Sequence, residues 1–114
     1  MREEELLVTW NEVVALLDEY ESLLSASQSS TLTMYYRYNL SLSEIAEEKG
    51  ESRAAAFDAL KKGIEKLRRY EEKLGLVRKR AIVLECAEEI RHAQTLEEAK
   101  EAGAALRKEY FHGI

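Results

Sequence analysis

The sequence LSLSEIAEEKGESRAAAFDALKKGIEKL, residues 40–67, contains the signals that decide the fold. Ser41 followed three residues later by Glu44 has the spacing of a capping box, so a helix is predicted to begin directly after this serine. The helix should be short, because Gly50 can adopt the positive φ that follows a helix end. Ser52 then offers a second N-cap before a long helical pattern. Two helices joined by so short a turn make a helix-turn-helix.

The composition favours an all-α protein. The chain has 114 residues and no proline, and its single cysteine cannot form an internal disulfide. Its acidic start, MREEE, lacks the basic and apolar regions of a signal peptide, and its apolar runs are too short to span a membrane. We therefore expect a cytoplasmic protein with no membrane partner.

The N-terminal region predicts one long helix over residues 3–24. Its apolar residues recur at alternating spacings of four and three, which places them on one helix face. Two interpretations remain open for this face. It covers the helix-turn-helix core, or part of it forms a homodimer or partner interface, because small monomers seldom expose a large apolar patch. The candidate interface residues are Leu6, Trp10, Val13 and Leu17.

Further helices are predicted on both sides of the motif. A short helix passes through residues 32–36 and ends at Asn39, and the second motif helix covers residues 53–74 and stops at Gly75. Two more helices are expected over residues 81–94 and 96–110, the last one started by a Thr95/Glu98 capping box. The first of these is expected to have Ile82, Val83, Cys86 and Ile90 as its apolar side, and the second is expected to bury Leu96, Ala99, Ala102 or Gly103, and Leu106.

These elements predict an N-terminal helix plus helix-turn-helix core over residues 1–76, with the core itself at about residues 22–74. Residues 77–114 form a C-terminal helical extension. Two arrangements stay open for this extension: it completes a single compact unit, or it acts as a dimerising arm.

The net charge of −5 is unevenly distributed along the chain. Residues 1–52 contain 3 basic and 11 acidic residues, residues 53–80 contain 10 and 4, and residues 81–114 contain 4 and 7. The positive excess therefore lies on the second motif helix and its continuation, which is the part of the chain that a polyanion would contact.

Nucleic-acid binding is one interpretation of this basic helix, and a solvated helix face is the other. Lysines and arginines near the ends of a recognition helix contact phosphates. The helix has few side chains that could read base edges. Ala54, Ala55 and Ala59 can contact only a thymine methyl group, and Asp58 would repel the phosphate backbone. The candidate nucleic-acid-binding residues are Arg53, Lys61, Lys62, Lys66, Arg68 and Arg69.

Catalytic and metal-binding patterns are not found, so we expect neither an enzyme nor a cofactor. Glu89 and His92 have the Glu-x-x-His spacing of di-iron bundles, but such sites need a second copy on a facing helix. Cys86 lies on an apolar face six residues before this histidine, which is not a zinc-ligand spacing. No nucleophile elbow or phosphate-binding glycine loop occurs.

A family resemblance covers about two thirds of the chain. Residues 35–76, YYRYNLSLSEIAEEKGESRAAAFDALKKGIEKLRRYEEKLGL, resemble the YlxM family of small bacterial helix-turn-helix proteins and look like region 4 of bacterial sigma factors. The most specific part is LSLSEIAEE followed by a glycine and Ser52-Arg53. The resemblance implies a sigma region 4-like core and a regulatory or accessory role in the signal recognition particle pathway.

The sequence and the family resemblance lead to three hypotheses for the function. The first is a non-enzymatic accessory protein that binds signal recognition particle RNA or protein, with residues 61–80 as the electrostatic contact. The second is a DNA-binding transcriptional regulator that uses Arg53. The third is a helix-turn-helix scaffold that binds only proteins, including a second copy of itself.

Overall fold

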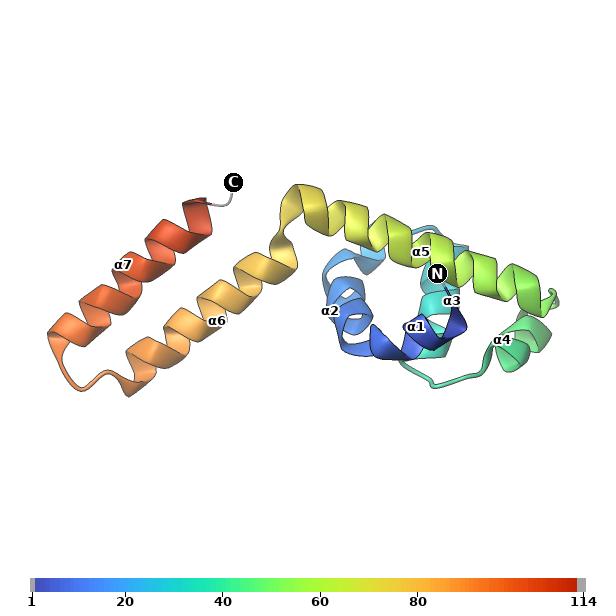
Figure 1. The fold of residues 1–114 in the computed structure, drawn as a ribbon, viewed down its shortest axis with the longest axis horizontal. Coiled ribbons are helices and arrows are strands. Elements are labelled where there is room, and N and C mark those ends of the chain that lie inside the picture. Colours follow the sequence, from blue (N-terminus) through green and yellow to red (C-terminus); the bar gives the residue numbers. More distant parts are fainter. Residues whose placement is uncertain (1, 113–114) are drawn as a thin grey trace. The chain divides into compact units, whose positions relative to one another are not determined.

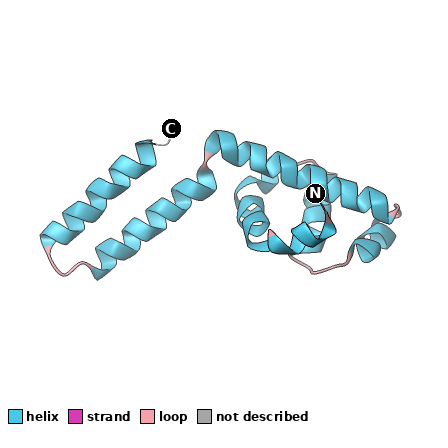
Figure 2. Cartoon of the chain, viewed as in Figure 1, coloured by secondary structure: helices cyan, strands magenta, loops and turns pink. Residues whose placement is uncertain are grey.

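The computed structural model describes residues 2–112 and is built from α-helices, with one short 3₁₀ helix and no strand in that range (Figures 1 and 2). The elements in chain order are α1 (Glu3–Val8), α2 (Trp10–Tyr20), the 3₁₀ helix η1 (Glu21–Leu23), α3 (Ala26–Tyr36), α4 (Leu42–Lys49), α5 (Arg53–Leu74), α6 (Leu76–His92) and α7 (Leu96–His112). They divide into two compact units, Met1–Leu74 and Gly75–Ile114. The all-α prediction is confirmed.

The predicted helix-turn-helix is formed by α4 and α5. Ser41 Oγ accepts a hydrogen bond from the Glu44 backbone N–H at 3.1 Å, and Glu44 Oε1 accepts one from the Ser41 N–H at 3.1 Å. Gly50 ends α4 with φ 66° and ψ 38°, in the left-handed region. Ser52 Oγ accepts from the Ala55 N–H at 3.0 Å and so caps α5. All three local predictions are confirmed.

Helix α5 is the centre of the first unit, because it packs against α2, α3 and α4. Its buried face follows the helical repeat. The residues of this face are Ala56, Leu60, Gly63, Ile64 and Leu67. The opposite face of the same helix is left to solvent, and this division positions the candidate site described below.

Gly63 is required where α5 crosses α3. A Cβ placed on this glycine would lie 2.8 Å from Leu32 Cδ1 and 3.3 Å from Leu32 Cγ, and Leu32 is itself fully buried. Alanine favours a helix by about 1 kcal/mol over glycine. We nevertheless expect Gly63→Ala to lower the free energy of unfolding by about 1–2 kcal/mol, because forced repacking of a core costs more than that gain.

Chemical denaturation measures this effect. Trimming the neighbour in the double variant Leu32→Val/Gly63→Ala should recover part of the loss relative to the sum of the two single variants. Simple additivity of the two single changes would contradict the steric explanation.

The N-terminal region departs from its prediction as one helix over residues 3–24. It is divided into α1, α2 and η1, with a break at Thr9, whose φ is −93° and ψ is 11°. The Thr9 hydroxyl donates to the Glu5 carbonyl at 2.7 Å. Such a bond from a side chain to the preceding turn competes with regular helix geometry, and the sequence pattern of apolar residues gives no sign of it.

The interface hypothesis for the N-terminal face is corrected by burial. Leu6, Val13 and Leu17 are each 0% exposed and contribute to the core of the first unit. The half-buried Trp10 packs its ring against Tyr36 and Tyr35, with centroids 5.0 and 5.8 Å away. The three buried residues therefore face the interior of the first unit, whereas Leu7 and Leu23 of the same region are 64% and 46% exposed. The covering interpretation replaces the homodimer interpretation for the four candidate residues.

Tyr36 makes the first unit sensitive to alkaline pH. Its hydroxyl donates to the Leu6 carbonyl at 3.3 Å, and burial raises the pKa of Tyr36 to about 12. The folded state therefore holds this proton more tightly than the unfolded chain, whose tyrosine pKa is about 10. Stability is complete below pH 10 and is lost as the pH rises from about 10 to about 12, by up to about 2–3 kcal/mol.

Denaturation at a series of alkaline pH values tests this expectation. Tyr36→Phe should flatten the loss between pH 10 and 12, whereas Tyr38→Phe, at a side chain that is 70% exposed, should leave it unchanged. An identical slope in wild type and Tyr36→Phe would show that another group controls alkaline unfolding.

The second unit is a hairpin of α6 and α7. Gly75 has the left-handed φ of 61° expected at the end of α5, but α6 starts immediately after it and not at residue 81. The chain therefore divides at residue 74, where the sequence predicted 76. Thr95 Oγ1 accepts from the Glu98 N–H at 3.1 Å and starts α7 as predicted.

Burial in this hairpin differs from the prediction. Ile82, Cys86 and Ala102 are buried, as expected. Val83 and Ile90, on the predicted apolar side of α6, are 40% and 44% exposed, and Leu96, which was wrongly predicted to be buried, is 69% exposed. Two helices have only one mutual contact face, so a helix with a wide apolar surface leaves part of it uncovered.

Candidate nucleic-acid interface

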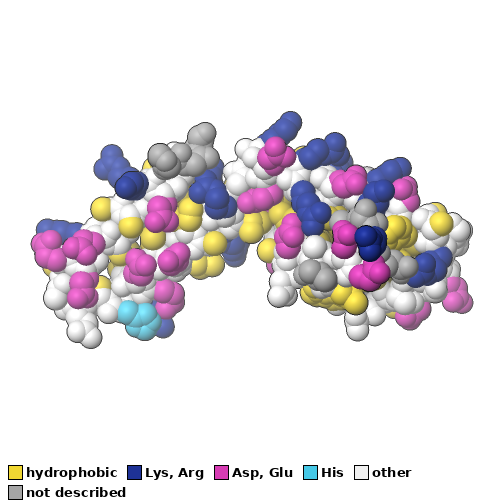
Figure 3. All heavy atoms as spheres, viewed as in Figure 1, with side chains coloured by type: hydrophobic (Ala, Val, Ile, Leu, Met, Phe, Trp, Pro, Cys, Tyr) yellow, Lys and Arg dark blue, Asp and Glu magenta, His cyan; other side chains and the backbone are white. Residues whose placement is uncertain are grey.

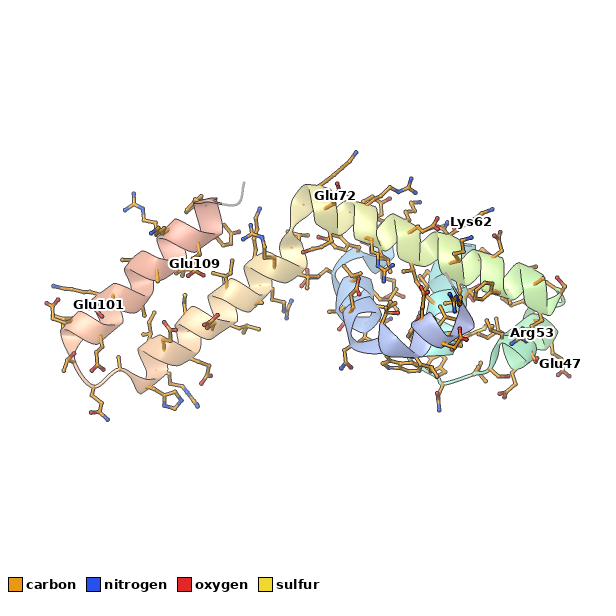
Figure 4. The ribbon with its side chains drawn as sticks, in the orientation of Figure 1. Glu47, Arg53, Lys62, Glu72, Glu101 and Glu109 are labelled. Carbon is orange, nitrogen blue, oxygen red and sulfur yellow. The ribbon has the colours of Figure 1, made fainter. Side chains whose placement is uncertain are left out.

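The start of α5, where a recognition helix contacts DNA, lies beside carboxylates of α4 and of the turn. Arg53 and the exposed Ala54 and Ala55 begin the helix, and Asp58 follows one turn later in an ion pair with Lys62 (3.0 Å). Figure 4 shows Glu47 of α4 at the same end of the motif as Arg53. We call this region the recognition end, and its charged residues are Glu47, Glu48, Lys49, Glu51, Arg53 and Asp58.

Lys49 and Glu51 both make this region less favourable for binding a phosphate. Lys49, at the end of α4, directs its Nζ to α3, where it donates to Thr31 Oγ1 at 2.6 Å and to the Ser27 carbonyl at 3.1 Å. Glu51 in the turn has a buried Oε1 without a hydrogen-bond partner among the described residues. A phosphate backbone would therefore meet mainly carboxylates at the recognition end.

From its middle to its C-terminal end, α5 carries a row of cations that we call the basic stripe: Lys62, which is paired with Asp58, and Lys66, Arg69 and Lys73. Their spacings of four, three and four place them on one helix face. At 1.5 Å per residue the stripe extends over about 16 Å. Figure 3 shows Lys and Arg side chains along α5, and Figure 4 shows Lys62 projecting from it. The buried face of α5 points elsewhere, so packing leaves the stripe accessible to a ligand.

A shallow depression lies within the stripe and is lined by Lys66, Arg69, Tyr70 and Lys73. Lys66 Nζ lies 6.0 Å from the centroid of the Tyr70 ring. Tyr70 is held in place, because its hydroxyl donates to the Leu23 carbonyl at 3.2 Å and its ring lies 5.9 Å from that of Tyr20. A fixed aromatic wall beside three cations can receive a phosphate and the sugar attached to it.

Arg68 belongs to the scaffold and not to this surface. Its Nε lies 2.9 Å from Glu12 Oε1 and its Nη2 lies 3.4 Å from Glu12 Oε2, so it joins α5 to α2 through both carboxylate oxygens. The two adjacent arginines therefore have different environments: Arg68 contacts Glu12, whereas Arg69 is exposed on the stripe. Replacing Arg68 would disturb the helix packing, and we leave it out of the interface.

The six sequence-predicted residues are therefore divided among four places, one of which is the contact of Arg68 with Glu12 described above. Lys62, Lys66 and Arg69 come together on the stripe, Arg53 lies at the recognition end, and Lys61 lies one residue, or 100° of helix rotation, away from the stripe. Lys73 and Tyr70 were not among the six candidate residues, although both lie in the predicted contact segment, residues 61–80. The four-residue spacing from Arg69 to Lys73 is a signal that would have found the lysine.

The side chains considered for metal binding or catalysis, Cys86, Glu89 and His92, lie on α6. No group of three or more His, Cys, Asp or Glu side chains in this range is arranged to hold a metal ion. His92 pairs with Glu88 at 3.3 Å and not with Glu89, and both partners are exposed. Burial, with nearby Glu89, raises the pKa of the Cys86 thiol. None of the helices in the described range combines the length and apolarity of a membrane span.

Comparison with known proteins identifies the family. The sequence profile of UPF0122, described as "Putative helix-turn-helix protein, YlxM / p13 like", matches residues 7–106. The chain belongs to the UPF0122 family. The resemblance to YlxM seen in residues 35–76 is thereby confirmed, and the profile also covers most of the α6–α7 hairpin.

Individual UPF0122 relatives come from several bacteria. A UPF0122 protein of Listeria innocua is 46% identical over 69 residues, which cover 60% of this chain and 63% of the relative. A UPF0122 protein of Clostridium perfringens is 43% identical over 68 residues (60% and 61%), and one of Bacillus cereus is 48% identical over 64 residues (56% and 58%). The chain spans less than two thirds of the length of these relatives, and their names state no substrate or partner.

Proposed function

We propose that this UPF0122 protein is a non-enzymatic accessory protein of cotranslational targeting in the cytosol, and that it binds the RNA of the signal recognition particle through the basic stripe. The observation that carries the proposal is the row of Lys62, Lys66, Arg69 and Lys73 on α5, in which Lys66 is half-buried and the other three cations are exposed. We infer the pathway from the resemblance to the YlxM family, and we infer the contact surface from the positions of the cations of the basic stripe.

Phosphate contact is the chemistry that this surface offers. The stripe has four cations on about three turns of a rigid helix, which suits successive phosphates along one strand. Double-stranded RNA is recognised largely through its backbone and shape, because side chains cannot read its deep and narrow major groove. The stripe needs no base-reading side chain for such binding.

Sequence-specific DNA reading has less support. A recognition helix places its first turns in the major groove, yet here those turns present alanines and lie among the carboxylates of the recognition end. In this proposal the main role of the helix-turn-helix is to hold α5 so that the basic stripe faces solvent. The transcriptional regulator and the protein-only scaffold are the competing outcomes of the experiment below.

Fluorescence-anisotropy titration tests the proposal, with signal recognition particle RNA compared against random duplex DNA of similar length. We expect tighter binding to the RNA that persists at physiological salt. The logarithm of affinity should fall with the logarithm of salt with a slope of about −3 to −4 for four phosphates. Preference for a DNA duplex would favour the regulator. Binding to neither nucleic acid at low salt would overturn the proposal and favour a protein target.

A further inference from the structure

An aromatic side chain, Tyr70, borders the basic stripe. It follows Arg69 directly and comes four residues after Lys66, so the helical repeat places it between the stripe and the buried face of α5. Tyr70 is half-buried, and its ring lines the depression together with Lys66, Arg69 and Lys73. The phosphate contacts proposed above leave this ring without a role.

The Tyr70 ring is fixed from the protein side. Its hydroxyl donates to the Leu23 carbonyl at 3.2 Å. Its centroid lies 5.9 Å from that of Tyr20, which is fully buried and donates its own hydroxyl to Glu71 Oε1 at 2.6 Å. Because Tyr20 is buried, it packs against the inner side of Tyr70, and the depression lies on the outer side. A ring that is already fixed binds a flat partner at a lower cost in entropy.

Lys66 lies over the Tyr70 ring and is able to move away from it. Its Nζ is 6.0 Å from the ring centroid, at the outer limit of a cation–π contact. A phosphate oxygen is a stronger partner for an ammonium group than so distant a ring, because the hydrogen bond to it is charge-assisted. When a phosphate lies on the stripe, Lys66 can therefore turn toward it and open the ring.

The size of the depression suits one flat group. Its volume is about 250 Å³. Pockets that enclose a whole drug-sized ligand have about 300–1,000 Å³. A single aromatic ring system lying against Tyr70 would therefore occupy the depression.

The two edges of the stripe differ in charge. Tyr70 lies along one edge, whereas Glu65 and Glu72 lie along the other, each one residue before a stripe lysine and about 100° of helix rotation from it. Both glutamates are exposed. A nucleic-acid strand whose phosphates follow the stripe is repelled by this acidic edge. Its bases are therefore directed to the edge that holds Tyr70.

We propose that Tyr70 is a stacking platform for one unpaired base of the bound RNA, while Arg69 and Lys73 contact the adjoining phosphates. In a continuous duplex the neighbouring bases cover each base face, whereas a base in a bulge or loop can be turned out onto an aromatic side chain. Stacking tolerates all four bases, because each has a π-face. The site therefore selects RNA that has an unpaired nucleotide, and this inference rests on the proposed RNA binding.

Three hairpin RNAs with the same stem test the inference with the full chain. The first is fully paired, the second has one unpaired adenosine in the stem, and the third has an abasic residue at that position. Fluorescence anisotropy should show at least about fivefold tighter binding of the adenosine bulge than of the paired stem, from the stacking of one base. The abasic bulge has the same flexible backbone without the base, so it should bind like the paired stem.

Substitution of Tyr70 connects this preference to the ring. Tyr70→Leu should bind the adenosine bulge and the paired stem equally, with an affinity for the paired stem within about threefold of wild type, because the stripe is intact. Tyr70→Phe should keep the preference, because it retains the ring and loses only the hydroxyl. Tyr38→Leu is the matched control, since Tyr38 is 70% exposed and lies outside the stripe, and it should leave all three affinities unchanged.

Photocrosslinking locates the base without any change in the protein, and it decides the case if circular dichroism shows that Tyr70→Leu is unfolded. A 5-iodouridine at the unpaired position should crosslink wild type within the tryptic fragment Tyr70–Lys73. A crosslink confined to other fragments would overturn the assignment to Tyr70.

The RNA comparison separates this inference from the proposal on which it rests. Equal binding of the paired stem and the adenosine bulge by wild type would overturn the stacking platform and leave RNA binding by the stripe in place. An abasic bulge that binds as tightly as the adenosine bulge would also overturn it, because bending of the backbone would then explain the preference. Binding of none of the three RNAs at low salt would overturn both.

Discussion

Reversing two charges of the basic stripe, in Arg69→Glu/Lys73→Glu, is expected to weaken binding to signal recognition particle RNA by at least about 100-fold. A hydrogen bond to a charged group contributes about 1.5–3 kcal/mol, and the substituted carboxylates add repulsion from the phosphates. Two lost contacts therefore exceed the roughly 2.8 kcal/mol that corresponds to 100-fold. Both residues are exposed, so the fold should be unaffected. Anisotropy titration measures the affinity, and the salt slope should become shallower by about 2.

The matched control is Arg53→Glu/Lys61→Glu, which changes the net charge by the same amount on the same helix. These two residues lie off the stripe, so we expect an affinity within about fivefold of wild type, as expected for a loss of long-range attraction alone. The opposite order of effects would place the contact at the recognition end and support DNA-type docking. Equal losses in both variants would mean that only total charge matters and that the stripe is not a site.

Leu60→Ala is expected to destabilise the first unit by about 2–5 kcal/mol, because a fully buried leucine is removed at the centre of its core. Helix α5 packs against α2, α3 and α4, so the cavity is enclosed by several helices and cannot easily collapse. A small domain has only about 5–15 kcal/mol of stability, so this is a large share. The melting temperature should fall by about 10 °C or more.

Trp10 fluorescence follows the unfolding of the first unit, because this tryptophan is the only one in the chain and packs from α2 against Tyr35 and Tyr36 of α3. Leu74→Ala is the control, since it makes the same chemical change on the same helix at a side chain that is 44% exposed. We expect it to change stability by less than about 1 kcal/mol. Similar losses in the two variants would show that α5 is not the centre of the core.

The local features of the motif could be predicted from the sequence because their causes lie within a few residues. The capping box of Ser41 and Glu44 needs only a three-residue spacing, and Gly50 and Gly75 end helices because glycine accepts positive φ. Ser52 starts α5 by the same short-range hydrogen bonding. These four positions fix the lengths of α4 and α5, and with them the helix-turn-helix.

The sequence by itself thus determined the helix-turn-helix, the all-α class and the family, whereas only the tertiary structure decided which surfaces are available. Leu6, Val13 and Leu17 had the pattern of an apolar helix face, and their burial follows from how α1 and α2 fold over the motif. Arg68 and Arg69 are adjacent, yet Glu12, 56 positions away, holds one against the scaffold and leaves the other on the stripe. Helical periodicity defines the faces of each helix, but long-range packing decides which neighbour each face meets.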